Sequence, residues 1–102
     1  MSKEAEFQGL EATGFTVYTK KNCRFCDQVA ALLARDAAYD AVTWVEADGY
    51  IEDGGAKKAR FLAFIDDLVG GGIKHRTFPM VFFDGKFVGG FSDTKEFLDE
   101  KF

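Results

Sequence analysis

The spacing of apolar residues changes along this chain. Short runs of apolar residues predict four strands. Residues 15–19, 42–46 and 80–83 are rich in β-branched and aromatic side chains, a composition typical of strands. Asp84-Gly85 follows the third of these runs, and such a dipeptide favours a tight hairpin. The hairpin leads into residues 86–88, which we predict as a fourth strand.

Longer stretches repeat their apolar residues at helical spacing. From Cys23 to Ala37 and again over residues 56–69, apolar side chains recur three and four positions apart, which indicates two amphipathic helices. Asp93 is a good N-cap for a third helix near the end of the chain. Residues 48–55 show no such period, and we expect a loop there.

The predicted order of elements is β-α-β-α-β-β-α, which indicates an α/β fold. The helix between the first two strands favours a parallel pair, whereas the last two strands form an antiparallel hairpin. We therefore expect a mixed four-stranded sheet with helices on both faces. Residues 1–102 are expected to form a single domain, in which 1–13 are a frayed or partly helical lead-in and Trp44 belongs to the core.

Composition narrows the class of protein. Hydrophobic residues make up 47% of the 102 residues and twelve of them are Phe, enough to build a core without disulfides or a structural metal. The net charge of −4 argues against non-specific nucleic-acid binding, which depends on neutralising phosphates. No apolar run approaches the roughly 18 residues of a membrane span. Acidic residues near Met1 disfavour a secretory signal, so we expect a cytoplasmic protein without membrane partners.

The only two cysteines, Cys23 and Cys26, form a Cys-x-x-Cys motif at the predicted junction of loop and helix. Unpaired N–H groups and the helix dipole stabilise a thiolate at such a position. Lys20, Lys21 and Arg24 add positive charge. We therefore expect Cys23 to be the nucleophile and the more buried Cys26 to be the resolving thiol, which attacks a mixed disulfide on Cys23.

Three other interpretations of the pair are weaker. A static disulfide closing so short a loop would constrain the unfolded chain little. A zinc site needs four ligands, and beside the two cysteines the chain offers His75 and would need a carboxylate. Two unreactive core cysteines would fit poorly beside charged Lys21 and Arg24. Redox chemistry without a resident metal remains the favoured interpretation.

Three separated motifs resemble those of glutaredoxins, from about Phe15 to the C-terminus. Lys20 stands three residues before Cys23, as in the family's Lys-x-x-Cys-x-x-Cys. The run 76–79, Arg-Thr-Phe-Pro, is similar to the family's Thr-Val-Pro element, and 89–93, Gly-Gly-Phe-Ser-Asp, to its Gly-Gly-x-x-Asp element. The resemblance implies a thioredoxin-like (glutaredoxin) fold.

The resemblance also implies a glutathione site. Cys23 would carry glutathione as a mixed disulfide, and Lys20 would hold the glycine carboxylate. Pro79 would be a cis-proline that leaves the Phe78 backbone free to pair with the cysteinyl part. Ser92 and Asp93 would hold the γ-glutamyl end. The expected binding residues are Lys20, Phe25, Thr77, Phe78, Pro79, Gly90, Ser92 and Asp93.

A glutathione-dependent thiol–disulfide oxidoreductase is the implied activity. Its partners would be glutathione and disulfide-containing or glutathionylated proteins, with ribonucleotide reductase as one candidate, and the protein would act as a monomer. Two alternatives remain: a thioredoxin-like dithiol donor reduced by a flavin reductase, and a carrier that ligates an iron–sulfur cluster through Cys23 and glutathione.

The chain departs from the family pattern in two places. Arg24 and Phe25 stand where the commonest dithiol motif has Pro and Tyr, so the iron–sulfur role stays open. The segment 70–75 is longer than usual, which blurs the alignment of the preceding helix; Lys57 and Arg60 are candidates for a further glutathione contact there. We expect Lys74, His75 and Arg76 to be a solvated charge run.

Overall fold

The computed structural model describes residues 6–36, 41–52 and 54–101. Its centre is a four-stranded sheet in the order β2-β1-β3-β4. The first two strands are parallel and β3 runs antiparallel to β4, both as predicted. β3 also pairs with β1, and this pair is antiparallel. The strands are β1 (Phe15–Thr19), β2 (Val42–Glu46), β3 (Met80–Phe83) and β4 (Lys86–Gly89).

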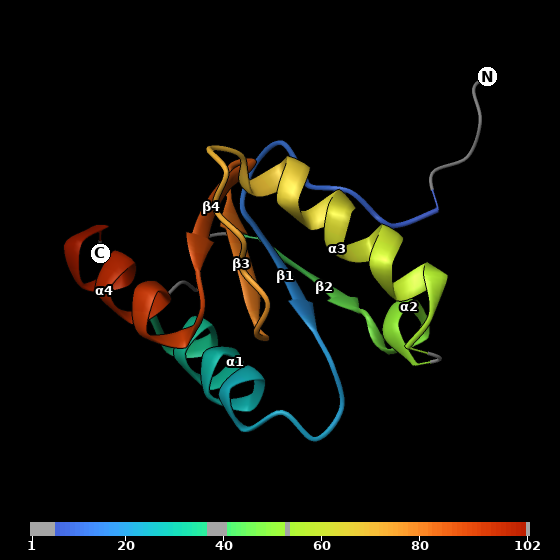
Figure 1. The fold of residues 1–102 in the computed structure, drawn as a ribbon. Helices are drawn as coiled ribbons and strands as arrows, with labels where there is room; N and C mark the ends of the chain where they lie inside the picture. Colours follow the sequence, from blue (N-terminus) through green and yellow to red (C-terminus); the bar gives the residue numbers. More distant parts are fainter. Residues whose placement is uncertain (1–5, 37–40, 53, 102) are drawn as a thin grey trace.

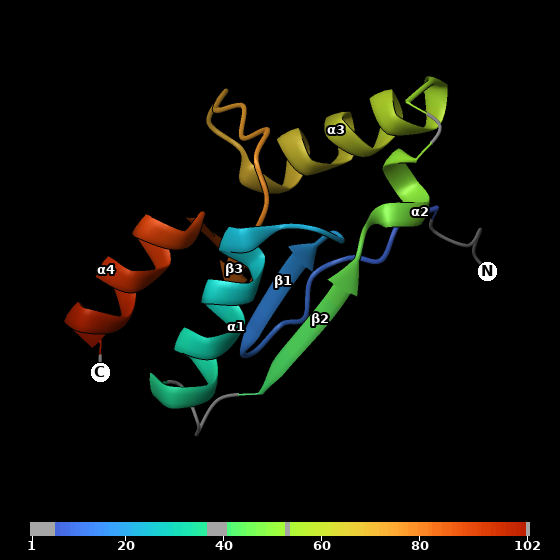
Figure 2. The same ribbon diagram turned by 90° about the horizontal axis from the view of Figure 1, so that it is seen from below.

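Helices cover both faces of this sheet, which confirms the predicted fold class. α1 and α4 lie together on one face, and α2 and α3 lie on the other (Figures 1 and 2). Within the described residues, no helix is both long and apolar enough to cross a membrane. The helices are α1 (Arg24–Asp36), α2 (Asp48–Ile51), α3 (Ala56–Val69) and α4 (Phe91–Lys101).

The loop predicted over residues 48–55 is wrong in its first half, where α2 forms. The amide of Tyr50 donates to the oxygen of Ala47 over 2.9 Å, and that of Glu52 donates to Asp48 over 2.9 Å. One turn of helix is too short to show a hydrophobic period, so the sequence pattern could not reveal it.

The two faces of β1 enter two different cores. Phe15 and Val17 point toward α1 and α4, where Val29 and Leu33 of α1 are also buried. Tyr18 points the other way, toward Phe61 of α3. This alternation follows from the period of two in a strand. Ala37, the last apolar position of the predicted first helix, lies outside the described residues.

The N-terminal lead-in is better ordered than predicted where the structure describes it. Residues 6–13 form no helix, but Phe7 is buried among Tyr50, Phe61 and Phe64. The remainder of the predicted lead-in, residues 1–5, lies outside the described part of the chain. A single aromatic residue has no periodicity, so its burial could not be predicted from the local pattern.

Trp44 does not belong to the core, contrary to the prediction. Its side chain is 42% exposed, although its neighbour Val45 on the other face of β2 is only 2% exposed. β2 is an edge strand, and helix α1 covers Val42 at one end of it but leaves the indole of Trp44 partly open.

The hairpin between β3 and β4 is as predicted. Asp84 and Gly85 both have positive φ, 51° and 80°, as a two-residue type I′ turn requires. Asp84 also accepts a hydrogen bond from the Gly14 amide over 2.7 Å and donates its own amide to the Gly14 oxygen over 2.9 Å. The turn therefore also fixes the start of β1.

Candidate functional site

The two cysteines lie at the N-terminus of α1, where the sequence placed them. Cys23 is the N-cap: its oxygen accepts from the Asp27 amide over 3.1 Å, and its Sγ accepts from the Cys26 amide over 3.1 Å. The pair is joined by a disulfide. Cys23 is 9% exposed and Cys26 is 5% exposed. The sulfur of Cys23 therefore takes the place of a capping oxygen and is the more accessible of the two.

The segment before β3 passes directly beside this disulfide. The oxygen of Phe78 lies 3.7 Å from Cys23 Sγ, and the Phe78–Pro79 peptide bond is cis, as the resemblance implied. Among the residues that the structure describes, no three His, Cys, Asp or Glu side chains are grouped closely enough to hold a metal ion.

A groove of about 300 Å³ lies between the first turn of α1, which contributes Phe25, and the start of α4. It brings together residues from three separate segments. Six of them belong to the predicted site: Phe25, Thr77, Phe78, Gly90, Ser92 and Asp93. His75 and Phe91 complete the lining.

The groove continues past Phe25, Thr77 and Phe78 into a second hollow of about 440 Å³. Lys20 lines this second part, and its Nζ lies 5.7 Å from the centre of the Phe78 ring. Of the predicted residues, Pro79 is buried behind the groove and lines neither part. The other members of the second part are Ile51, Lys58, Leu62 and Arg76.

Asp93 is not the N-cap of α4, contrary to the prediction. The helix begins at Phe91, so Gly90 is the N-cap and accepts the first helical bond, from the Thr94 amide over 3.0 Å. Asp93 sits in the first turn and accepts from the Gly90 amide over 3.3 Å, which is the reciprocal half of a capping box. The carboxylate nonetheless lines the groove, next to Ser92.

The two candidates on the second long helix do not reach the groove. Arg60 is paired with Glu6 through two hydrogen bonds of 2.8 and 2.6 Å, and Lys57 lies over the ring of Tyr50, 5.9 Å from its centre. Lys58 lines the groove instead. The sequence could not choose among neighbouring basic residues without knowing how α3 is rotated.

Sequence reasoning missed two aromatic members of the groove. Phe91 stacks against Phe25, with ring centres 5.9 Å apart. His75 lies with Nε2 3.4 Å from the oxygen of Pro79 and packs its ring against Phe87, 5.1 Å between centres. Phe91 lies inside a recognised motif, and His75 directly precedes the motif residue Arg76, so proximity in sequence was the available signal.

The predicted charge run before Pro79 is partly paired. Arg76 donates two hydrogen bonds to the carboxylate of Asp66 on α3, over 2.7 and 3.0 Å, and Lys74 lies 3.5 Å from the same group. The Arg76 guanidinium lowers the pKa of Asp66 from its usual value. These contacts tie the long linker to α3 at the rim of the groove.

Comparison with known proteins gives a consistent result. The family model for Glutaredoxin matches residues 15–88. No curated protein matches the chain. Glutaredoxin 1 from Francisella tularensis, solved with cacodylate, has 22% identity and a TM-score of 0.66, over 84% of this chain and 92% of that one.

Two further solved structures are similar. Oxidised glutaredoxin 2 from Chlamydomonas reinhardtii has 30% identity and a TM-score of 0.55, over 85% of this chain and 72% of that one. A buckwheat glutaredoxin–glutathione complex has 24% identity and a TM-score of 0.57, over 86% of this chain and 71% of that one.

Proposed function

This chain belongs to the glutaredoxin family and is a thiol–disulfide oxidoreductase, and from this premise we propose that glutathione is its electron donor. The observation that carries the proposal is the groove beside Cys23. It has lysines at one end and the N-terminus of α4 at the other. This arrangement suits a small peptide with a carboxylate at each end and a thiol between them.

Different residues of the groove would bind different parts of glutathione. Lys20, with Lys58 nearby, would hold the glycine carboxylate by charge. The Phe78 backbone, whose oxygen already lies 3.7 Å from Cys23 Sγ, would pair with the cysteinyl part. Ser92 and the free amides of α4 would hold the γ-glutamyl carboxylate, because a helix N-terminus favours anions. Asp93 would face the γ-glutamyl ammonium.

Thr77, Gly90 and Phe25 would shape this site rather than carry charge. Phe25 forms a wall with Phe91, and Thr77 lies in both parts of the groove. Pro79, which lies behind the groove, would act by fixing the backbone of Phe78. The solved buckwheat protein was crystallised with glutathione, which supports glutathione as the ligand of this family site.

Reduction of a glutathionylated protein would need only Cys23. Its thiolate attacks the glutathione sulfur, the protein leaves as a thiolate, and the Cys23–glutathione disulfide forms. A second glutathione thiolate then attacks that glutathione sulfur, releasing oxidised glutathione and regenerating the Cys23 thiolate. Two glutathione molecules, the one removed from the protein and the one added, thus end as one disulfide.

Reduction of a protein disulfide would use both cysteines. Cys23 attacks one sulfur, and Cys26 then attacks Cys23, so that the protein leaves with two thiols and the Cys23–Cys26 disulfide remains. The structure holds the pair in this oxidised form. Two glutathione molecules would reduce it again.

The partners follow from this chemistry. We infer that the protein acts as a monomer in the cytoplasm on glutathionylated or disulfide-containing proteins, with ribonucleotide reductase as one candidate. Residues 1–102 would work as one domain, because the groove draws on segments from Lys20 to Asp93.

Intact mass spectrometry tests the proposal. We expect reduced protein mixed with oxidised glutathione to gain one glutathione, mapped to Cys23, when Cys26 is replaced by Ser. The C26S variant should keep most of its turnover of a glutathione mixed disulfide, because only Cys23 is needed. The C23S variant should lose it by at least a hundredfold, because the nucleophile is gone.

Two results would count against the proposal. Glutathione added to Cys26 in the C23S variant, with none added to Cys23 in the C26S variant, would show that the nucleophile is assigned wrongly. Failure of glutathione to reduce the Cys23–Cys26 disulfide, together with rapid reduction by a flavin-dependent thioredoxin reductase, would favour the thioredoxin-like alternative.

A further inference from the structure

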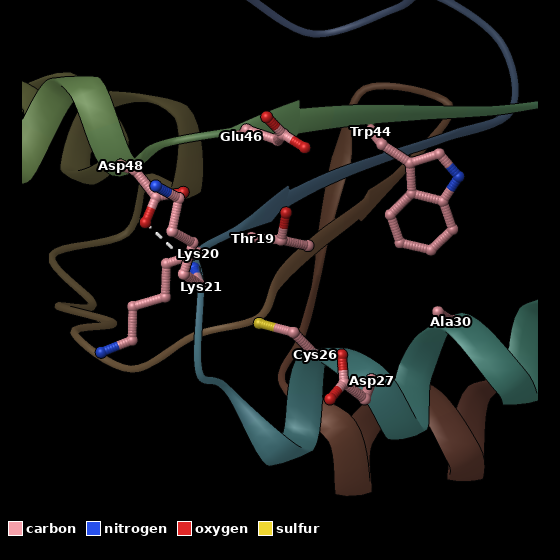
Figure 3. Close-up of a pocket in the computed structure, with 9 residues that line it drawn as sticks. All are labelled: Thr19, Lys20, Lys21, Cys26, Asp27, Ala30, Trp44, Glu46 and Asp48. Carbon is pink, nitrogen blue, oxygen red and sulfur yellow. Dashed lines mark hydrogen bonds between the residues drawn. The ribbon is translucent and has the colours of Figure 1, made fainter.

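A separate pocket, which is not part of the glutathione groove, lies on the opposite flank of the disulfide from that groove. It has a volume of about 310 Å³ and opens between the end of β2 and the start of α1 (Figure 3). Cys26 lines it but lines neither part of the groove, whereas Lys20 lies between the two hollows and lines both. We call it the Cys26 pocket. Its lining residues are Thr19, Lys20, Lys21, Cys26, Asp27, Ala30, Trp44, Glu46 and Asp48.

Trp44 provides the aromatic wall of the Cys26 pocket. It is the only tryptophan of the chain and is 42% exposed, although the strand that carries it also presents buried positions such as Val45. The indole lies at the Ala30 end of the pocket, over the middle of α1 (Figure 3). A large aromatic face is therefore left open within the pocket that Cys26 also lines.

The charges in the pocket are separated. Lys20, Lys21 and Asp48 gather at the end away from Trp44 (Figure 3), where Asp48 Oδ1 accepts from the Lys21 amide over 3.0 Å. Glu46 and Asp27 lie between that end and Trp44. In the described part of the chain neither of these two carboxylates has an ion-pair partner.

We propose that the Cys26 pocket receives a basic side chain from the protein substrate whose sulfur is exchanged at Cys23. The face of tryptophan is the strongest aromatic partner for a guanidinium or ammonium group. Two unpaired carboxylates beside that face would add charge attraction. With glutathione in its own groove on the other flank, the polypeptide of a mixed disulfide would lie toward Cys26 and reach Trp44. The inference rests on exchange with protein substrates at Cys23.

The pocket would select among protein substrates without altering the chemistry. Small mixed disulfides carry no side chain that reaches it, so their turnover should not depend on Trp44 or Glu46. A substrate with arginine beside its cysteine should react faster than one with glutamate, because glutamate would face the carboxylates. We expect a preference of about tenfold, the combined size of one cation–π contact and one exposed ion pair.

Glutathionylated peptides test this directly. Three peptides would carry arginine, alanine or glutamate on both sides of one glutathionylated cysteine, and kcat/KM would be measured for each. The wild-type order should be arginine, alanine, glutamate. In E46K the preference for arginine over glutamate should disappear or reverse. In W44A, kcat/KM should fall several-fold for the arginine peptide and stay unchanged for the other two. E100K, the same change on exposed α4, is the matched control and should keep the wild-type order.

The outcomes separate the inference from the proposed function. Equal rates for the three peptides in the wild type, or a preference unchanged in E46K, would overturn the pocket. Loss of turnover of the glutathione–mercaptoethanol disulfide in the wild type would instead contradict the proposed function. In that case, binding to the Cys26 pocket can still be measured by Trp44 fluorescence. A peptide that carries arginine on both sides of a serine, in place of the cysteine, should shift the emission of Trp44. The absence of a shift would overturn the inference.

Discussion

The sulfur of Cys23 takes its chemistry from its position as a helix cap. Its distance of 3.1 Å from the Cys26 amide is that of a capping contact, and the same N–H would face a thiolate in the reduced protein. An ionised sulfur is stabilised there by the helix N-terminus. Arg24, which stands where the commonest family motif has proline, is exposed and adds a cation.

Gly89 allows the backbone to approach Asp93 at the start of α4. Its φ of +135° is outside the range of ordinary side chains, and a Cβ there would come within 2.6 Å of Asp93 Cγ. We predict that Gly89→Ala lowers the free energy of unfolding by about 3 kcal/mol, from strain and overpacking together. Urea unfolding measures the change, and KM for glutathione should rise because Asp93 moves.

Gly71→Ala is the matched control for that prediction. Gly71 also has positive φ, +64°, but a Cβ there would meet nothing within 4 Å. Its substitution should therefore cost only about 1 kcal/mol, from the backbone alone. Equal costs at the two positions would mean that the contact with Asp93 is not as close as described.

Single residues in recognisable motifs were predictable, and isolated ones were not. Cys23 and Asp93 lie in spacings whose chemistry is known, although Asp93 proved to lie inside the helix rather than cap it. Trp44 was misassigned because aromatic residues in strands are usually buried, and the sequence does not say that β2 is an edge strand only partly covered by α1.

Tyr18 of β1 carries a buried hydroxyl that affects the stability of the strand. Its OH donates to the Gln8 oxygen over 2.7 Å, and burial raises its pKa. Below about pH 10, where an unfolded tyrosine is still protonated, this contribution is fully present. Above it the unfolded chain ionises first, so the free energy of unfolding falls as pH rises.

We therefore predict that Tyr18→Phe costs about 1 kcal/mol at pH 8, the worth of one hydrogen bond. At pH 11 this difference should disappear or reverse slightly, because only the wild type loses stability through this group, by roughly 1.4 kcal/mol. Urea unfolding at both pH values measures it, with both cysteines replaced by Ser to avoid thiol chemistry. A difference that stays constant would show that Tyr18 is not buried as described.

Elements with a sustained period were predicted with nearly their observed bounds. The strands at 15–19 and 42–46 and the helix at 56–69 match, because each has several residues that alternate or recur on one face. The short α2 was missed, and the N-cap of α4 was placed three residues late, at Asp93 instead of Gly90, because helix ends depend on local backbone bonds rather than on hydrophobic pattern.

The N-terminal segment contributes to the whole molecule by closing the core beneath α3. Phe7 is 5% exposed and its ring lies 4.9 Å from that of Tyr50 and 5.4 Å from that of Phe61. We predict that Phe7→Ala lowers the free energy of unfolding by about 3–4 kcal/mol, the usual loss for a buried Phe. Thermal or urea unfolding of the oxidised protein would show it.

Phe25→Ala provides the comparison, since the same atoms are removed from a side chain that is 49% exposed. It should cost no more than about 1 kcal/mol. If Phe7→Ala were no worse than Phe25→Ala, residues 6–13 would not be part of the folded core.

The groove is formed by segments that only the folded molecule brings together. Lys20, Thr77 and Ser92 are far apart in sequence, and they approach one another because β1 ends, β3 begins and β4 ends at the same end of the sheet. Their motifs allowed the family to be recognised, and thus the groove to be expected. The Cys26 pocket and the choice of Lys58 over Arg60 belong to no motif, and so required the packing of α1 and α3 to be known.

The pH dependence of the alkylation rate of reduced Cys23 shows whether the start of α1 stabilises its thiolate. Iodoacetamide labelling, quantified by mass spectrometry of the C26S variant, would follow the thiolate alone. We predict that labelling of Cys23 rises with a midpoint at least one pH unit below the ordinary thiol value of about 8.5. A midpoint near 8.5 would contradict it, because the start of α1 would then not stabilise the nucleophile.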